Sequence, residues 1–214
     1  VVFLGNRVQD ELYEQADFQN MGSSPATMEA AKGIDAFGCL PGNSIEQADA
    51  EQAYAQADLK GPPLWISLPR DARPKKWARM RTPVCLMKKA LYGHPDSGSF
   101  WEQHCNEQLT KIGFEIIPNW NSCFKHKTLK LFLLVYVDDF KLAGSAANLA
   151  EGWEKITTIT KTTNGLVIDE PTPVDKFLGC EHKELRVKIK STGKIDRARE
   201  GLMQSYVESC IEKY

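Results

Sequence analysis

Two adjacent carboxylates at the end of a long apolar run are the feature that most constrains this chain. Residues 131–137 are all hydrophobic, and Asp138 and Asp139 follow them directly. The run predicts a buried strand, and a tight turn at 137–139 can bring the carboxylates to one edge of a sheet. Hard divalent cations prefer such clustered oxygens. The alternative is an ordinary hairpin turn, where Asp is common.

A third carboxylate from elsewhere is needed for a site that handles phosphates with two metals. Asp49 is the candidate, because residues 44–49 predict a short strand that ends at this aspartate. The Ala- and Gln-rich residues 50–59 then predict a short helix.

Length and composition favour a folded chain. The 214 residues fit one domain or one domain with an appendage, and 42% hydrophobic with 26% charged residues is enough to bury a core. No apolar run approaches the roughly 20 residues that span a bilayer, so no membrane partner is expected. Residues 1–4 are typical of a strand and not of a signal peptide. We therefore expect a fragment of a longer intracellular polypeptide.

The six cysteines are scattered and contain no C-x-x-C pair. This pattern predicts free thiols in a reducing compartment. His104, Cys105, Cys123 and His126 are a conceivable zinc set, but their spacing matches no ordinary zinc module.

The net charge of −1 conceals a strong asymmetry. Residues 1–58 hold ten acidic and two basic side chains, whereas residues 60–89 hold nine basic and one acidic. A basic block of this kind is typical of a surface that binds a polyanion. The alternative is a loop that is charged for solubility.

The remaining patterns predict an α/β (α+β) fold. Ser24 and Pro25 suit the start of a helix that stops at Gly38. We expect further helices at 95–113, 147–160 and 201–214, strands at 1–4, 64–68 and 84–87, a basic loop at 69–83, a hairpin at 125–141 and two short strands within 177–190. Their order suggests a mixed sheet of the ferredoxin-like type found in polymerase palms.

Four segments then identify a family by resemblance. Residues 49–59 resemble the first catalytic motif of the reverse transcriptases of copia-type LTR retrotransposons, and residues 88–93 (KKALYG) are similar to another signature of that family. Residues 136–139 (YVDD) resemble its YxDD box, and residues 177–180 (FLGC) its primer-grip segment. Trp101 lies where the family has a Trp. The resemblance covers nearly the whole chain.

The resemblance implies an RNA-directed DNA polymerase that is part of a retrotransposon polyprotein. Asp49, Asp138 and Asp139 would be catalytic and would hold two Mg²⁺ ions, or Mn²⁺, with the Ala50 carbonyl as a further ligand. The implied partners are a primer on an RNA or DNA template, deoxynucleoside triphosphates, and the ribonuclease H and integrase of the polyprotein. The implied location is a cytoplasmic particle or the nucleus.

The resemblance also assigns binding residues. Tyr54 would be a steric gate under the incoming sugar, with a packed core aromatic as the alternative. Further nucleotide contacts would come from Lys88, Lys89 and Asp96. Primer and template contacts would come from Tyr136, Phe177, Leu178, Gly179, Lys75, Lys76 and Arg79.

Residues 94–99 depart from the family pattern. Asp96 stands where the family has a Gln that contacts the nucleotide, and Ser99 where it has an Arg. An alternative function is therefore a catalytically inactive remnant that keeps the fold and binds nucleic acid. In either case the resemblance implies fingers-like segments at 1–43 and 60–95, a palm at 44–59 and 96–184, and the primer-grip end and start of a thumb at 185–214.

Overall fold

The chain divides into two compact units. The computed structural model describes residues 4, 8–10, 12–16, 18, 23, 25–158 and 166–213. The smaller unit comprises Val1–Ser23 and Gln52–His104, and the larger comprises Ser24–Glu51 and Cys105–Tyr214. The strand expected at residues 1–4 falls outside the described residues except for Leu4, which lies in no strand.

An antiparallel sheet forms the centre of the larger unit. Its strand order is β4-β5-β6-β7-β1-β8. The bounds are Glu115–Ile116 (β4), Cys123–His126 (β5), Leu131–Tyr136 (β6), Asp139–Ser145 (β7), Asn43–Asp49 (β1) and Thr172–Pro173 (β8). Every pairing between these described strands is antiparallel, so the expectation of a mixed sheet is wrong. An apolar run indicates that a strand is buried, but it does not indicate whether the neighbouring strands are parallel or antiparallel.

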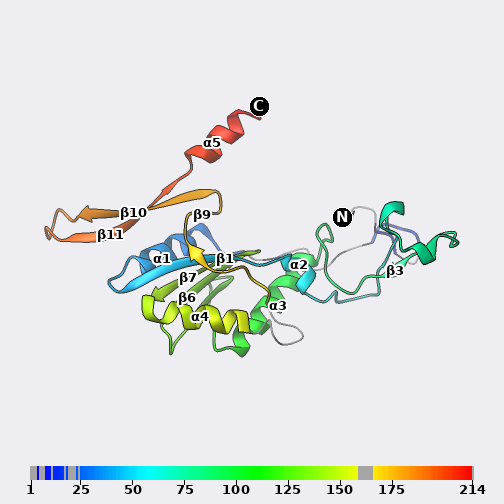
Figure 1. The fold of residues 1–214 in the computed structure, drawn as a ribbon, viewed down its shortest axis with the longest axis horizontal. Coiled ribbons are helices and arrows are strands. Elements are labelled where there is room, and N and C mark those ends of the chain that lie inside the picture. Colours follow the sequence, from blue (N-terminus) through cyan, green and yellow to red (C-terminus); the bar gives the residue numbers. More distant parts are fainter. Residues whose placement is uncertain are drawn as a thin grey trace. The chain divides into compact units, whose positions relative to one another are not determined.

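Two helices cover opposite faces of this sheet (Figure 1). Helix α1 (Met28–Gly38) buries Ile34 in one cluster with Leu134 and Ala143 of the sheet. Helix α4 (Ala146–Thr158) approaches the sheet closely at Gly152, where a Cβ atom would collide with Leu131. The sheet is therefore buried on both faces, which explains the nearly continuous apolar run of β6.

Helix α1 begins later than expected. Its N-cap is Thr27, whose Oγ1 accepts a hydrogen bond from the Ala30 backbone N–H at 3.2 Å. Ser24, the expected cap, lies outside the described residues. A Thr side chain satisfies an otherwise unpaired amide of the first turn as a Ser side chain does, so the pattern alone could not choose between them.

A second sheet follows in the larger unit. Its order is β11-β10-β9, formed by Ile195–Leu202 (β11), Cys180–Lys188 (β10) and Lys176–Phe177 (β9). The two short strands expected in 177–190 are in fact β9 and a nine-residue β10 that pairs with β11. The sequence did not reveal β11, because its side chains are mostly polar and show no apolar alternation. Helix α5 (Gln204–Ile211) therefore starts after residue 201.

The smaller unit contains little regular structure. Helix α2 spans Ala53–Gln56, shorter than the expected 50–59, because Gln52 has a left-handed φ of 49° and Ala57 is extended. Strands β2 (Trp65–Ile66) and β3 (Cys85–Leu86) form a two-stranded sheet. Two 3-10 turns, Arg70–Ala72 and Lys75–Trp77, lie in the basic loop. Helix α3 (Ser97–Lys111) runs from this unit into the larger one.

None of the described helices is long and apolar enough to span a membrane.

Candidate active site

Strands β1 and β7 bring three carboxylates to one end of the main sheet. Asp49, the last residue of β1, lies opposite Asp139, the first residue of β7. The backbone N–H of Ala50 donates to the Asp138 carbonyl at 2.7 Å. The predicted strand end at Asp49 and the predicted hairpin with Asp138 and Asp139 thus meet at the same edge.

The turn between β6 and β7 has an unusual backbone. Tyr136 pairs with Asp139, so only Val137 and Asp138 connect the strands. Val137 has a φ of 58°. A positive φ at the first of two turn residues suits a tight hairpin, but a β-branched residue rarely adopts it. The turn therefore stores strain at the point where the carboxylates gather.

The three carboxylates interact electrostatically. The pKa of Asp139 is raised to about 6, first by burial and then by the charges of Asp49 and Asp138 and a hydrogen bond with Asp49. Like charges held this closely disfavour ionisation, so Asp139 retains a proton to higher pH than an ordinary Asp.

The donor chemistry of this trio suits a hard divalent cation. Three carboxylates and the neighbouring Ala50 carbonyl offer only oxygen ligands. A bound cation would relieve the repulsion that raises the pKa of Asp139. In the described part of the chain, however, no three His, Cys, Asp or Glu side chains are arranged to hold a metal ion. The backbone thus positions the carboxylates, and their side chains would have to turn toward an ion.

Among the described residues, no three His, Cys, Asp or Glu side chains are arranged as a zinc site either. Of the conceivable set, His126 packs edge-on against Phe114 with ring centroids 5.2 Å apart. Cys123 is fully buried, and burial raises its pKa to about 11, which disfavours the thiolate that zinc requires. All six cysteines are free thiols.

The predicted nucleotide contacts lie in the smaller unit. Tyr54 is half-buried in α2, and its ring centroid lies 4.4 Å from that of Tyr92. Lys89 is exposed but pairs with Asp58 at 2.7 Å and donates to the Gln56 carbonyl at 3.0 Å. Lys88 is exposed. Their contacts with a nucleotide remain predictions.

Asp96 directly precedes α3. Its backbone N–H donates to His94 Nδ1 at 3.2 Å, and its carbonyl accepts from Phe100 N–H at 3.1 Å. An acid at a helix N-terminus is favourable, which gives this departure from the family pattern a structural reason. One carboxylate oxygen, Oδ1, is nevertheless buried without a hydrogen bond.

The predicted primer contacts lie in the larger unit. Leu178 and Gly179 form the two-residue turn between β9 and β10, with φ values of 51° and 74°. Two positive φ values are the signature of a type I′ hairpin turn, which is strained for Leu. Phe177 is buried before this turn, and Tyr136 is half-buried beside the β6–β7 turn.

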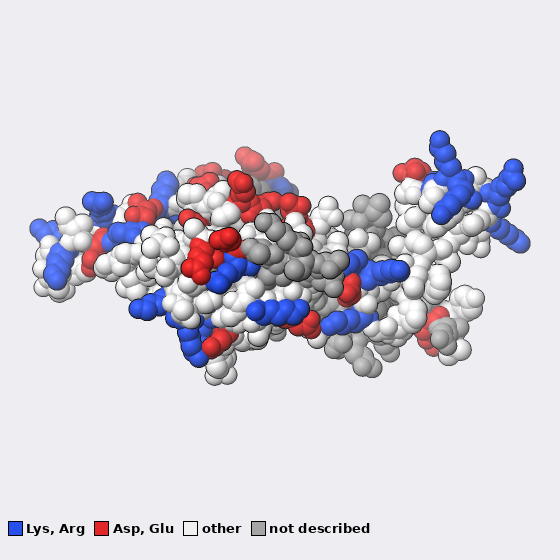
Figure 2. All heavy atoms as spheres, turned by 60° about the horizontal axis from the view of Figure 1, so that its bottom comes forward, with Lys and Arg blue, Asp and Glu red and all other residues white. Residues whose placement is uncertain are grey.

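The predicted template contacts Lys75, Lys76 and Arg79 are all exposed. Figure 2 shows Lys and Arg side chains projecting together where Figure 1 places β3. Among the described residues of this basic loop, Asp71 is the only acidic one, so the loop carries a net positive charge.

A buried ion cluster near the primer-grip segment was not predicted from the sequence. Lys141 on β7 is fully buried and pairs with Asp35 of α1 at 2.7 Å. The only available signal was a lysine inside an otherwise apolar strand, since the two partners lie far apart in the sequence.

Comparison with known proteins assigns the class. Residues 9–196 match the family described as reverse transcriptase (RNA-dependent DNA polymerase), so the chain belongs to this family. The resemblance seen in the sequence is thereby confirmed.

Similar proteins come from Saccharomyces cerevisiae. The Transposon Ty1-DR1 Gag-Pol polyprotein and the Truncated transposon Ty1-A Gag-Pol polyprotein are each 31% identical over 155 residues, which is 70% of this chain. The matched region spans 8% and 12% of their respective lengths. No solved structure gives a significant match.

Proposed function

We propose that this chain is the polymerase domain of a retrotransposon polyprotein and adds deoxynucleotides to a primer on an RNA or DNA template. The observation that carries the proposal is the register of β1 and β7, which sets Asp49 opposite Asp139 beside the Asp138 turn. Family membership supports the same reaction.

The reaction is an in-line attack of a primer 3′-hydroxyl on the α-phosphate of a nucleotide. Asp49, Asp138, Asp139 and the Ala50 carbonyl would hold two Mg²⁺ ions, or Mn²⁺, which when bound activate the hydroxyl and stabilise the leaving pyrophosphate. The chain's own contribution is to hold the carboxylates at one sheet edge by the β1–β7 pairing and the Ala50–Asp138 hydrogen bond. The raised pKa of Asp139 reflects burial and like-charge repulsion that a bound cation would offset.

The main sheet would be the centre of the palm, which would comprise residues 44–59 and 96–184. Helix α3 lies between β1 and β6 in the chain, together with α2 and the strands β2 to β5, and α4 lies between β7 and β8. The four strands β1, β6, β7 and β8 have the spatial order β6-β7-β1-β8. This is the arrangement of a ferredoxin-like β-α-β-β-α-β unit. Residues 1–43 and 60–95 would supply the partial fingers, and residues 185–214, which include α5, would form the primer-grip end and the start of the thumb.

Binding roles follow from chemistry and exposure. The exposed cations Lys75, Lys76 and Arg79 would contact template phosphates. The strained Leu178–Gly179 turn and Phe177 would hold the primer strand, with Tyr136 along the primer terminus. Tyr54 would lie under the sugar, while Lys88, Lys89 and Asp96 would border the triphosphate.

One observation favours a second candidate, the inactive remnant that only binds nucleic acid. The buried, unbonded Oδ1 of Asp96 is an unfavourable arrangement in a segment that should attract an anionic triphosphate. If Asp96 lies at the nucleotide, repulsion would weaken nucleotide binding while leaving template binding intact.

Extension of a labelled primer on an RNA template separates the two candidates. Both the 214-residue chain and the natural polypeptide that contains it should be assayed with Mg²⁺ and with EDTA. We expect elongation with Mg²⁺ and none with EDTA. If both polypeptides bind the primer–template without elongating it, the chain is an inactive remnant whose function is to bind nucleic acid.

A further inference from the structure

A lysine is buried two residues beyond the candidate catalytic Asp139. Lys141 has no exposed side-chain surface, and its Nζ lies 2.7 Å from Asp35 Oδ1. Its Nζ also lies 4.6 Å from the centroid of the Phe177 ring. Lys141 thus contacts both α1 and the first residue of the primer-grip segment.

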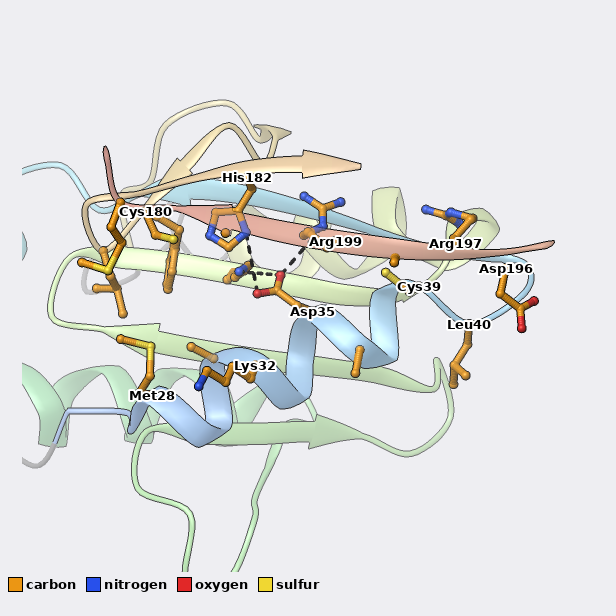
Figure 3. A pocket seen from close by; sticks show the side chains of 18 of the residues that line it. Met28, Lys32, Asp35, Cys39, Leu40, Cys180, His182, Asp196, Arg197 and Arg199 are labelled. Carbon is orange, nitrogen blue, oxygen red and sulfur yellow. Dashed lines mark ion pairs between the residues drawn. The ribbon is translucent and has the colours of Figure 1, made fainter. Parts of the chain in front are cut away.

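Asp35 also faces Arg199 and His182, which come from the β10–β11 hairpin (Figure 3). Arg199 of β11 places Nε 3.9 Å from Asp35 Oδ1, and His182 of β10 places Nδ1 3.7 Å from Asp35 Oδ2. Burial, together with the charges of Lys141 and Arg199, lowers the pKa of His182, so this imidazole is neutral near pH 7. One carboxylate therefore connects α1 with β7, β10 and β11.

A cavity interrupts the apolar packing on one side of this cluster. A cavity of about 890 Å³ separates α1 from the β10–β11 hairpin, and Phe177 and Leu178 lie in its wall. Phe177 nevertheless belongs to the apolar core cluster with Ile34 and Leu134, and Leu178 packs against that cluster, so apolar packing and ion contacts together hold the β9–β10 turn. The ion contacts of Asp35 and the cation–π contact of Lys141 supply the connection across the gap.

Stability alone is a poor explanation for such a cluster. The cost of desolvating a buried ion pair can equal or exceed the gain from its attraction, and apolar replacements are often equally stable. A buried charge pair is better suited to fixing a particular arrangement of the elements that carry it.

We propose that Lys141 is a positioning residue that sets the primer-grip turn relative to the carboxylates. Held by Asp35, Lys141 fixes the Phe177 ring and hence the Leu178–Gly179 turn. Lys141 belongs to the same strand as Asp139, so this turn is placed relative to the strand that begins with Asp139. The inference rests on the proposed function, in which this turn holds the primer.

The test compares Lys141→Met, Lys141→Arg and the exposed control Lys127→Met in the natural polypeptide that contains this chain. Lys141→Met should raise the Kd for a primer–template about tenfold, with an unchanged KM for the nucleotide at saturating primer–template. Lys141→Arg should restore the primer–template affinity, and Lys127→Met should match the wild type. A purely structural role would instead lower the active fraction and leave both constants unchanged, which would overturn the proposal.

A second measurement is independent of polymerase activity. Backbone hydrogen exchange in residues 176–182 should become faster in Lys141→Met while exchange in β1 stays the same. If Lys141→Met alone is unstable, the double variant Asp35→Asn with Lys141→Met replaces it in this measurement. The double variant removes both charges of the pair, so neither charge is left buried without the other. If exchange at the turn is unchanged in a folded variant, the positioning role is wrong, whether or not the wild type extends primers. A wild type that fails to extend primers while exchange responds as expected would instead overturn the proposed function alone.

Discussion

At the scale of single residues, the three carboxylates that would bind a metal ion lower the stability of the metal-free protein. Burial and the charges of Asp49 and Asp138 disfavour ionised Asp139 in the metal-free protein. We therefore expect Asp139→Asn to raise the melting temperature in EDTA by roughly 2–4 °C, equivalent to about 1 kcal/mol. Thermal unfolding with and without Mg²⁺ measures this. Mg²⁺ should stabilise the wild type more than the variant, and a variant that is less stable in EDTA would contradict the repulsion.

If Tyr54 lies under the incoming nucleotide, it determines whether the site accepts ribonucleotides as well as deoxynucleotides. An aromatic ring there excludes a 2′-hydroxyl by overlap, so Tyr54→Val should raise the use of ribonucleotides with little change for deoxynucleotides. The ratio of the two kcat/KM values is the measurement, because it is insensitive to a general loss of stability. The half-buried ring also packs against Tyr92. Equal losses for both substrates would show that Tyr54 serves only this packing.

At the scale of elements, the basic loop should bind phosphates. Replacing Lys75, Lys76 and Arg79 by Ala removes three exposed cations, which should weaken primer–template binding and reduce the slope of log K against log salt by about 2 to 3. The matched control replaces Lys125, Lys127 and Lys130, which lie on or beside the β5–β6 hairpin at the sheet end opposite the carboxylates. Binding titrations at several salt concentrations measure both slopes. Equal slopes for the two triple variants would mean that the loop is only a solvated surface.

The attachment of the β10–β11 hairpin should depend on pH through His182. Burial and Lys141 lower its pKa from 6.5, with Arg199 acting in the same direction and Asp35 only partly opposing them. The unfolded chain therefore gains a proton at higher pH than the folded protein. This group's contribution to stability is present above about pH 6.5 and is lost as the pH falls toward its folded-state pKa.

Thermal unfolding of the wild type and His182→Gln between about pH 5 and pH 8 tests this dependence. The wild type should lose stability on acidification relative to the variant, which cannot take up the proton. A constant difference between the two melting temperatures across this range would show that His182 does not titrate differently in the two states.

At the scale of the whole molecule, local sequence patterns predicted those elements that form through contacts between residues close together in the chain. The end of β1 at Asp49, the β6–β7 hairpin and the helix after residue 95 agree with the structure because apolar runs and turn residues lie close together in the chain. Strand direction and the polar strand β11 were not predictable, since both depend on partners distant in sequence. The Asp35–Lys141 pair was missed for the same reason, as α1 and β7 lie about a hundred residues apart.

The family assignment was predictable because its motifs are short and ordered along the chain, whereas the roles of their residues depend on a bound primer and nucleotide. The central claim is that Asp49, Asp138 and Asp139 form one metal-dependent polymerase site. Single-turnover incorporation of one nucleotide, on an RNA template with Mg²⁺, tests it most directly.

The decisive comparison is Asp138→Asn against Asp169→Asn. Asp169 is exposed, and its backbone N–H donates to the Asp49 carbonyl at 2.8 Å, so it is a nearby carboxylate outside the trio. Asp138→Asn should slow incorporation by at least about a hundredfold, with primer–template affinity and melting temperature retained, while Asp169→Asn should incorporate at close to the wild-type rate. Equal incorporation by the wild type and a folded Asp138→Asn protein would contradict the account.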